Sequence, residues 1–115
     1  MDHPAVFPAP TPTPPYCAVV FSTIRRAGDD TGYAAAAQRM VELAARQPGF
    51  LGLESVRGNG GEGITVSYWR DREAARQWGN VAEHREVQRV GRELWYRAFT
   101  LRICEVTEEW AGSRP

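Results

Sequence analysis

The pattern of apolar and polar residues changes abruptly at Tyr16. From there to Ile24 the chain is almost continuously apolar and rich in β-branched and aromatic residues, which predicts a buried strand. Residues 50–57 and 64–69 predict two more strands, and the short glycine-rich loop between them predicts a hairpin. A last strand is predicted over residues 98–106.

Residues 33–47 have the spacing of an amphipathic helix. Apolar side chains recur there at intervals of three and four residues, so one face of the helix is apolar. Pro48 and Gly49 follow, a helix breaker and a residue that readily adopts left-handed backbone, and they predict the stop.

A second helical segment follows the third strand. Asp71 is a suitable N-cap for a short helix that runs to Trp78, and Gly79 is expected to interrupt it. Asn80, with Glu83 three residues later, then forms a capping box, which predicts that a helix restarts and continues to about residue 95.

The order of these elements is strand, helix, strand, strand, helix, strand. It predicts an α+β, ferredoxin-like βαββαβ fold, with a four-stranded antiparallel sheet and both helices on one face. The first and last strands are then neighbours, which brings Cys17 close to Cys104. We expect both thiols to stay reduced, because bridges between adjacent strands are strained, and their spacing does not suggest a metal site.

The sheet face without helices predicts self-association. The third strand alternates an apolar set with a more polar set: Ile64, Val66 and Tyr68 against Thr65, Ser67 and Trp69. Apolar bulk on an uncovered face exceeds what monomers usually expose, so we expect two copies to pack sheet to sheet in a two-fold homodimer.

Residues 1–15 differ in composition from the rest of the chain. They hold six of the eight prolines, cannot form a core by themselves and are typical of a flexible tail. An arm that lies across a partner subunit and a docking motif for a proline-binding module are the alternatives. We expect the folded domain to span residues 16–108 and a polar tail to occupy residues 109–115.

Composition narrows the possible partners. The 14 acidic residues balance the 14 basic ones, which argues against nucleic-acid binding, and the lack of any lysine excludes a catalytic lysine. The sequence has neither an apolar run long enough to cross a membrane nor the apolar core of a signal peptide, so a cytoplasmic protein with free thiols is expected. The glycine cluster at residues 58–63 lacks the strand-to-helix context of a phosphate loop.

Three runs of sequence resemble the antibiotic biosynthesis monooxygenase family of dimeric α/β barrels: GYAAAAQRMVELAARQPGFLGLESVR, GITVSYW and EHREVQRVGRELWYRAFTLRICEV. The resemblance covers residues 16–108 and implies a homodimer of ferredoxin-like subunits. It also implies an oxidoreductase that attacks a small aromatic or polyphenolic substrate with molecular oxygen and no cofactor. Other members of the family degrade heme, which is then the substrate, and many have no assigned substrate.

His84 is the candidate catalytic base. Its spacing from Val87, Gly91 and Leu94 places it on the inward face of the helix, and its ordinary pKa lies near working pH. A buried histidine bonded to a carbonyl or an acid is the alternative interpretation. If heme is the substrate, the resemblance implies that His84 ligates the iron.

Four further residues are candidates for the substrate pocket. Trp78 and Trp69 can supply aromatic walls, Tyr68 can hold a substrate oxygen and Arg92 can stabilise negative charge. Packing is the alternative role for the tryptophans, and a solvated surface position is the alternative for the arginine. A non-catalytic dimer that binds a small apolar ligand is the third functional hypothesis, beside the oxygenase and the heme-binding protein.

Overall fold

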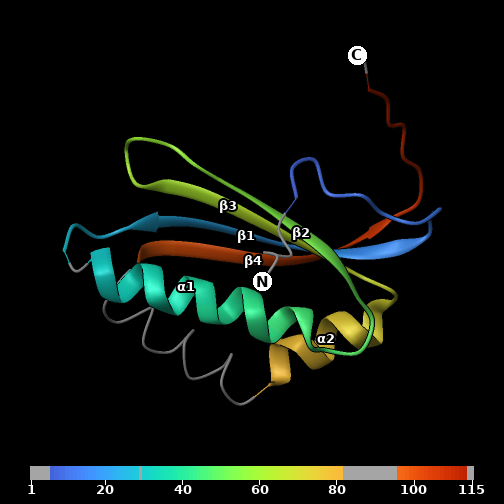
Figure 1. Cartoon of the computed structure of the whole chain (residues 1–115), viewed down its shortest axis with the longest axis horizontal. Coiled ribbons are helices and arrows are strands. Elements are labelled where there is room, and N and C mark those ends of the chain that lie inside the picture. Colours follow the sequence, from blue (N-terminus) through green and yellow to red (C-terminus); the bar gives the residue numbers. More distant parts are fainter. Residues whose placement is uncertain (1–5, 29, 82–95, 114–115) are drawn as a thin grey trace.

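The computed structural model describes residues 6–28, 30–81 and 96–113. Its elements follow the predicted order: β1 (Tyr16–Arg25), α1 (Asp30–Ala45), β2 (Phe50–Arg57), β3 (Glu62–Trp69), α2 (Arg72–Asn80) and β4 (Tyr96–Val106). The sheet has the strand order β2-β3-β1-β4, and every neighbouring pair is antiparallel. The helices lie together on one side of it (Figure 1). The predicted ferredoxin-like fold is therefore confirmed.

The ends of α1 differ slightly from the prediction. The helix begins at Asp30 and ends at Ala45, two residues before the expected end, and turn hydrogen bonds carry the chain on to Gln47. Gly49 has a φ of +85°, the left-handed conformation expected after the helix. Its carbonyl accepts a 2.7 Å hydrogen bond from the amide of Arg70, which ties the start of β2 to the end of β3.

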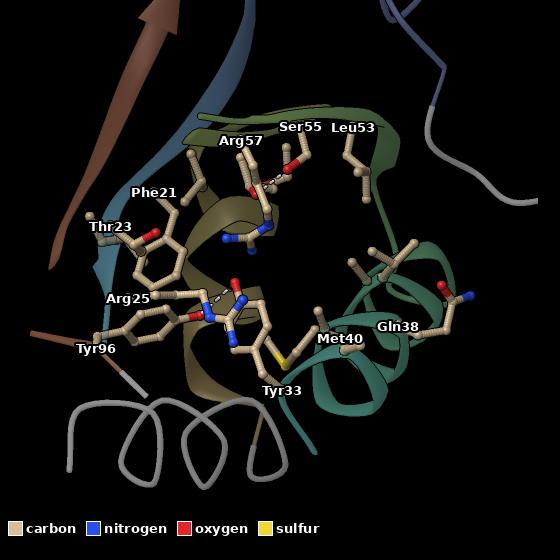
Figure 2. Close-up of a pocket in the computed structure, with 18 of the residues that line it drawn as sticks. Phe21, Thr23, Arg25, Tyr33, Gln38, Met40, Leu53, Ser55, Arg57 and Tyr96 are labelled. Atoms are coloured by element: carbon tan, nitrogen blue, oxygen red, sulfur yellow. Dashed lines mark hydrogen bonds between the residues drawn. The ribbon is translucent and has the colours of Figure 1, made fainter. Parts of the chain in front are cut away.

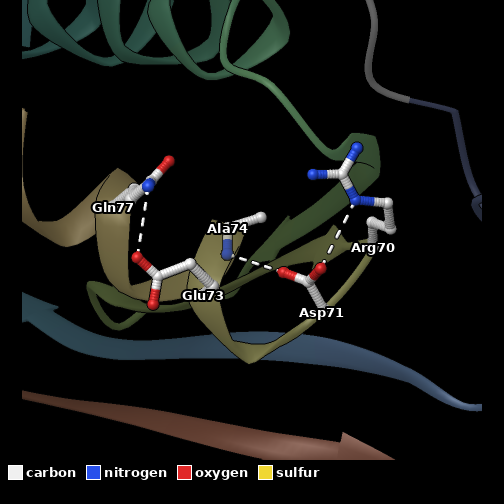
Figure 3. A network of polar contacts seen from close by, with 5 residues as sticks. All are labelled: Arg70, Asp71, Glu73, Ala74 and Gln77. Carbon is white, nitrogen blue, oxygen red and sulfur yellow. Dashed lines mark hydrogen bonds and ion pairs between the residues drawn. The ribbon is translucent and has the colours of Figure 1, made fainter.

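The start of α2 forms as predicted. The Asp71 carboxylate accepts a 2.8 Å hydrogen bond from the amide of Ala74, and a Gln77–Glu73 bond of 3.2 Å lies one turn further on (Figure 3). The interruption expected at Gly79 comes slightly later, because α2 includes this glycine and ends at Asn80, with Val81 already in extended backbone. A helical glycine costs only about 1 kcal/mol, which the burial of the neighbouring Trp78 can offset. The predicted restart up to residue 95 falls on residues 82–95, outside the described residues.

The core lies between the sheet and the helices. Trp69 is fully buried there, and its indole N–H donates a 2.9 Å hydrogen bond to the hydroxyl of Ser67. Its ring stacks on that of Trp78, with centroids 5.6 Å apart and planes 24° apart. This face therefore holds the more polar alternate set of β3, whereas Ile64 on the other face is 46% exposed.

The sheet register explains why the two cysteines stay apart. Cys17 pairs with Glu105, and Cys104 pairs with Ala18, one residue out of step. Successive residues of a strand point to opposite faces, so Cys17 lies in the core on the helix side and Cys104 is exposed on the other side. β1 and β4 are adjacent as predicted, and both thiols are free. The thiols do not pair because their side chains lie on opposite faces of the sheet, and not because of strain alone.

Residues 6–15, called the arm below, and the segment after β4 lie on the side of the sheet away from α1 and α2 (Figure 1). The amide of Val6 donates to the carbonyl of Leu53 at 3.3 Å, and the amide of Ala9 donates to the Glu54 carboxylate at 2.7 Å. Thr11 donates to Glu109 at 2.7 Å, so the arm also contacts the C-terminal segment.

Candidate functional site

A cavity of about 490 Å³ separates α1 from the helix-facing side of the sheet (Figure 2). It is large enough for a small aromatic molecule, since ligand sites usually measure about 300–1,000 Å³. The described residues that line it come from all four strands and both helices: Val19, Phe21, Thr23, Arg25, Tyr33, Ala34, Ala37, Gln38, Met40, Val41, Ala44, Leu53, Ser55, Arg57, Thr65, Ser67, Trp78, Tyr96 and Leu101.

Small side chains on both walls create this space. α1 presents alanines toward the sheet, and β2 and β3 present serines and a threonine where a packed core would carry larger residues: Ala34, Ala37, Ala44, Ser55, Ser67 and Thr65. Ser55 and Thr65 satisfy each other through a 2.8 Å hydrogen bond between their hydroxyls. The polar set of β3 therefore serves as cavity wall, which explains why it faces the helices.

One end of the cavity holds two arginines. The guanidinium carbons of Arg25 and Arg57 lie 4.1 and 4.6 Å from the centroid of the Tyr33 ring, which are cation–π distances. Tyr96 faces Tyr33, with hydroxyl oxygens 3.5 Å apart and rings in a T-shaped contact. Both arginines and both tyrosines are labelled in Figure 2, where they converge on the same space.

The side chain of Arg57 lies against the neighbouring strand β3. Its register partner on β3 is Gly63, and a Cβ atom there would lie 3.0 Å from a terminal nitrogen of Arg57. Partial burial lowers the pKa of Arg57, and the positive charge of Arg25 lowers it further. The described lining residues include neither Asp nor Glu.

The other end of the cavity is apolar and aromatic. Trp78 lines it together with Val19, Leu53 and Ala44. Trp69 lies directly behind, enclosed between Trp78 and Phe50, whose ring makes a T-shaped contact at 5.6 Å. Trp78 thus offers an aromatic surface to a ligand while Trp69 supports it from the core.

The structure separates the residues that the sequence grouped into one site. Trp78 lines the cavity as expected, but Trp69 does not reach it because its side chain is fully buried. Tyr68 points to the opposite face of the sheet, since it follows Ser67 and precedes Trp69 on the same strand. The predicted common pocket for these three residues is therefore wrong in its geometry. His84 and Arg92 lie outside the described residues.

Tyr68 belongs to a polar cluster under the arm. Its hydroxyl donates a 2.5 Å hydrogen bond to Glu54, and its ring makes a T-shaped contact with Tyr16 at 5.8 Å. Burial raises the pKa of Tyr68, and the bond to Glu54 raises it further. The hydroxyl of Tyr16 donates in turn to Glu109. These contacts hold the arm and the C-terminal segment on the sheet.

Sequence reasoning missed Arg25, Arg57 and Tyr33. The signal was present in the alternation of the strands, because Arg25 shares a face with Thr23 and Phe21, and Arg57 shares one with Leu53. Arginines at strand ends are common on surfaces, so the pattern alone did not separate a cavity position from a solvated one.

No group of three or more His, Cys, Asp and Glu side chains within residues 6–28, 30–81 and 96–113 could hold a metal ion. No helix among the described residues is long and apolar enough to cross a membrane.

Known proteins are similar to this chain over most of its length. A sequence model described as "Antibiotic biosynthesis monooxygenase" matches residues 15–90. The uncharacterized protein YqjZ of Bacillus subtilis strain 168 is 48% identical over 103 residues, which cover 90% of each chain.

Two solved structures illustrate the likeness of fold. Rv0793 from Mycobacterium tuberculosis superposes with a TM-score of 0.72 at 16% identity, covering 84% of this chain and 99% of that one. SnoaB from Streptomyces nogalater, a cofactor-independent oxygenase, superposes with a TM-score of 0.67 at 18% identity, covering 85% of this chain and 97% of that one. At these sequence identities the superpositions show a shared fold alone.

Proposed function

The chain belongs to the antibiotic biosynthesis monooxygenase family, and on that premise we propose that it is a cofactor-independent oxygenase of a small aromatic, phenol-bearing substrate. The observation that carries the proposal is the cavity between α1 and the sheet. It has the volume, the aromatic wall at Trp78 and the cationic end that such a substrate needs. SnoaB, which is a cofactor-independent oxygenase with the same fold, supports the reaction class.

The reaction needs little from the protein. In a hydroxyanthrone the central CH₂ carbon loses two hydrogens and gains one oxygen atom, and the second oxygen atom leaves with those hydrogens as water. The substrate supplies all four electrons. The protein must therefore remove a proton, stabilise the resulting anion and keep bulk water from the ring.

The side chains divide these tasks. The apolar lining, with Trp78 at one end, holds the rings and excludes water. Arg25 and Arg57 stabilise the anion, since positive charge near a developing oxyanion lowers its free energy. His84 is the proposed base and Arg92 a proposed further substrate contact; both rest on the sequence.

We also propose that the protein works as a homodimer through the sheet face that carries no helices. Val56 and Ile64 are register partners on that face and are 57% and 46% exposed. The arm adds Val6 and Phe7, which are 52% and 70% exposed. An apolar surface of this kind is best satisfied by a second copy, which closes a two-fold assembly.

Oxygen consumption tests the proposed activity. Purified protein, passed over a chelating resin, is mixed with a hydroxyanthrone or with polyphenols in an oxygen-electrode cell. The expected result is uptake well above the rate in buffer, with the matching quinone as product. If every substrate reacts no faster than in buffer, the proposed activity is wrong. A Soret band after adding hemin, lost in His84→Ala, would instead support the heme-binding alternative.

A further inference from the structure

Ser67 places a hydroxyl on a buried part of the cavity wall. Its side chain lines the cavity, yet the residue is only 7% exposed. Its register partners, Val19 on β1 and Leu53 on β2, also line the cavity and are only 4% and 3% exposed. A polar side chain between two buried apolar ones needs hydrogen-bond partners, because a buried hydroxyl without them lowers the stability of the fold.

The hydroxyl of Ser67 has one protein partner and one hydrogen that remains available. An indole N–H can only donate, so the 2.9 Å bond from Trp69 uses a lone pair of the Ser67 oxygen. Among the described residues, none accepts the hydrogen of this hydroxyl. The bond from the indole polarises the O–H group and makes it a better donor. Ser67 can therefore offer a polarised hydrogen to a ligand in the cavity that its side chain lines.

The other hydroxyl pair on this wall is in a different environment. Ser55 and Thr65 bond each other at 2.8 Å and lie at an exposed part of the wall, where water can accept the hydrogen that is left over. A ligand oxygen there only replaces water. At Ser67 a ligand oxygen instead satisfies a buried donor, which contributes more to binding.

The surroundings of Ser67 select the kind of ligand oxygen. Ser67 and Trp78 both contact Trp69 and both line the cavity, so they form neighbouring parts of its wall. Val19 and Leu53 complete this part with side chains that have no polar atoms. A carbonyl oxygen accepts the hydrogen bond and brings no hydrogen of its own. A phenol or an amide would bring an extra donor, which these side chains cannot satisfy.

We propose that Ser67 donates a hydrogen bond to a carbonyl oxygen of the ligand, so that the site prefers aromatic ketones whose carbonyl group lies beside Trp78. Ser67 is then a residue that positions the substrate, and Trp69 holds and polarises this donor from the core. The inference rests on the proposed function for the use of the site. It concerns binding and not oxidation, so it can be tested without turnover.

A matched pair of ligands tests the hydrogen bond. 1-Tetralone and tetralin have the same fused rings, and only the first carries a carbonyl oxygen. Their affinities for the wild type and for Ser67→Ala are measured from amide chemical shifts in NMR titrations. Loss of the hydroxyl should weaken the binding of tetralone by about fivefold, the size of a neutral hydrogen bond. The affinity for tetralin should not change, which also shows that the variant is folded.

The infrared spectrum of bound tetralone gives a readout that a merely structural role of Ser67 would not move. A hydrogen bond lowers the stretching frequency of a carbonyl group, so the band should lie lower in the wild type than in Ser67→Ala. Ser67→Thr keeps a hydroxyl and should keep the lowered band. Ser22→Ala is the control, because Ser22 pairs with Ile64 on the other face of the sheet, and it should behave as the wild type does.

Equal carbonyl frequencies in the wild type and Ser67→Ala would overturn the proposal, as would equal affinities for tetralone. Thr23 is a second buried hydroxyl of the wall, also 7% exposed. A shift that is lost in Thr23→Val but kept in Ser67→Ala would therefore also overturn it.

The wild-type spectrum needs no variant. A band at the frequency of tetralone in hexane would overturn the proposal even if Ser67→Ala fails to fold. Binding of neither ligand would overturn it together with the cavity as the site. A shift that depends on Ser67, without any oxygen uptake, would support this inference and contradict the proposed oxygenase.

Discussion

Trp69 and Trp78 stack with ring centroids 5.6 Å apart and planes only 24° apart, which joins the end of β3 to α2. The two rings have different surroundings on their outer sides. Trp69 is enclosed by the core, whereas Trp78 lines the cavity. One residue of the pair therefore serves mainly the stability of the fold, and the other also forms the ligand surface.

Trp69→Ala should be among the most destabilising single substitutions in the chain. It removes a fully buried ring, and such truncations cost about 3–5 kcal/mol because a cavity remains. Denaturant unfolding measures the change in the free energy of unfolding. Trp110→Ala is the control, since this tryptophan is 85% exposed, and its free energy of unfolding should hardly change. Similar losses in both variants would contradict the assignment.

Asp71 should make the stability of α2 depend on acidic pH. The amide of Ala74 holds the pKa of the Asp71 carboxyl below its usual range. A depressed pKa contributes stability above the unfolded value of about 3.9, and that contribution is lost as the pH falls through the folded value. Asp71→Ala should therefore be less stable than the wild type at neutral pH, with the gap closing in acid.

Asp71→Asn separates the cap from the charge. Asparagine also accepts the hydrogen bond of an N-cap, so this variant should keep most of the neutral-pH stability and lose the acid dependence. Thermal unfolding followed by circular dichroism at several pH values gives the comparison. A constant gap between wild type and Asp71→Ala from neutral to acidic pH would contradict the proposed role of the carboxylate.

Tyr68 should make the fold less stable in strong base. Burial and the hydrogen bond to Glu54 raise its pKa, so the folded phenol keeps its proton when the unfolded one, with a pKa of about 10, has lost it. The free energy of unfolding is therefore unaffected below that value and falls as the pH rises above it. In Tyr68→Phe this fall should be shallower, and an absorbance titration should lose one late-ionising tyrosine. Equal slopes for the two proteins would show that Tyr68 ionises normally.

A charge placed on the helix-free sheet face should weaken the proposed dimer. Val56→Glu combined with Ile64→Glu puts two carboxylates at adjacent exposed positions, and burying unpaired charges is costly. Sedimentation equilibrium should show the dissociation constant rising by about tenfold or more. Ala35→Glu, on the exposed side of α1, is the matched control and should leave it unchanged. A wild type that is monomeric at micromolar concentration would contradict the dimer.

The fold was predictable because its signals are local. Apolar runs marked the strands, the residues around Gly49 marked the end of α1, and Asp71 marked the start of α2, and each appears within a few residues of its expected place. The end of α2 was predicted two residues early, because a helix tolerates one glycine beside the buried Trp78, whose burial the sequence pattern does not measure.

The site was less predictable because it depends on which face each strand residue occupies. Tyr68 and Trp69 are neighbours in sequence, yet the alternation of the strand sends them to opposite sides of the sheet. The arginines of the cavity come from the ends of β1 and β2, and only the sheet register and the small residues of α1 bring them to one ligand space. Such long-range convergence leaves no motif in the chain.

The measurement that tests the central claim most directly is oxygen uptake by two phenylalanine variants of α1. Ala37 lines the cavity, whereas Ala35 is exposed and does not, so Ala37→Phe fills the ligand space and Ala35→Phe adds the same ring outside it. With a hydroxyanthrone, the wild type and Ala35→Phe should consume oxygen at similar rates, and Ala37→Phe should be slower by about tenfold or more because the rings no longer fit. Full activity in a folded Ala37→Phe would contradict the claim that this cavity is the site of reaction.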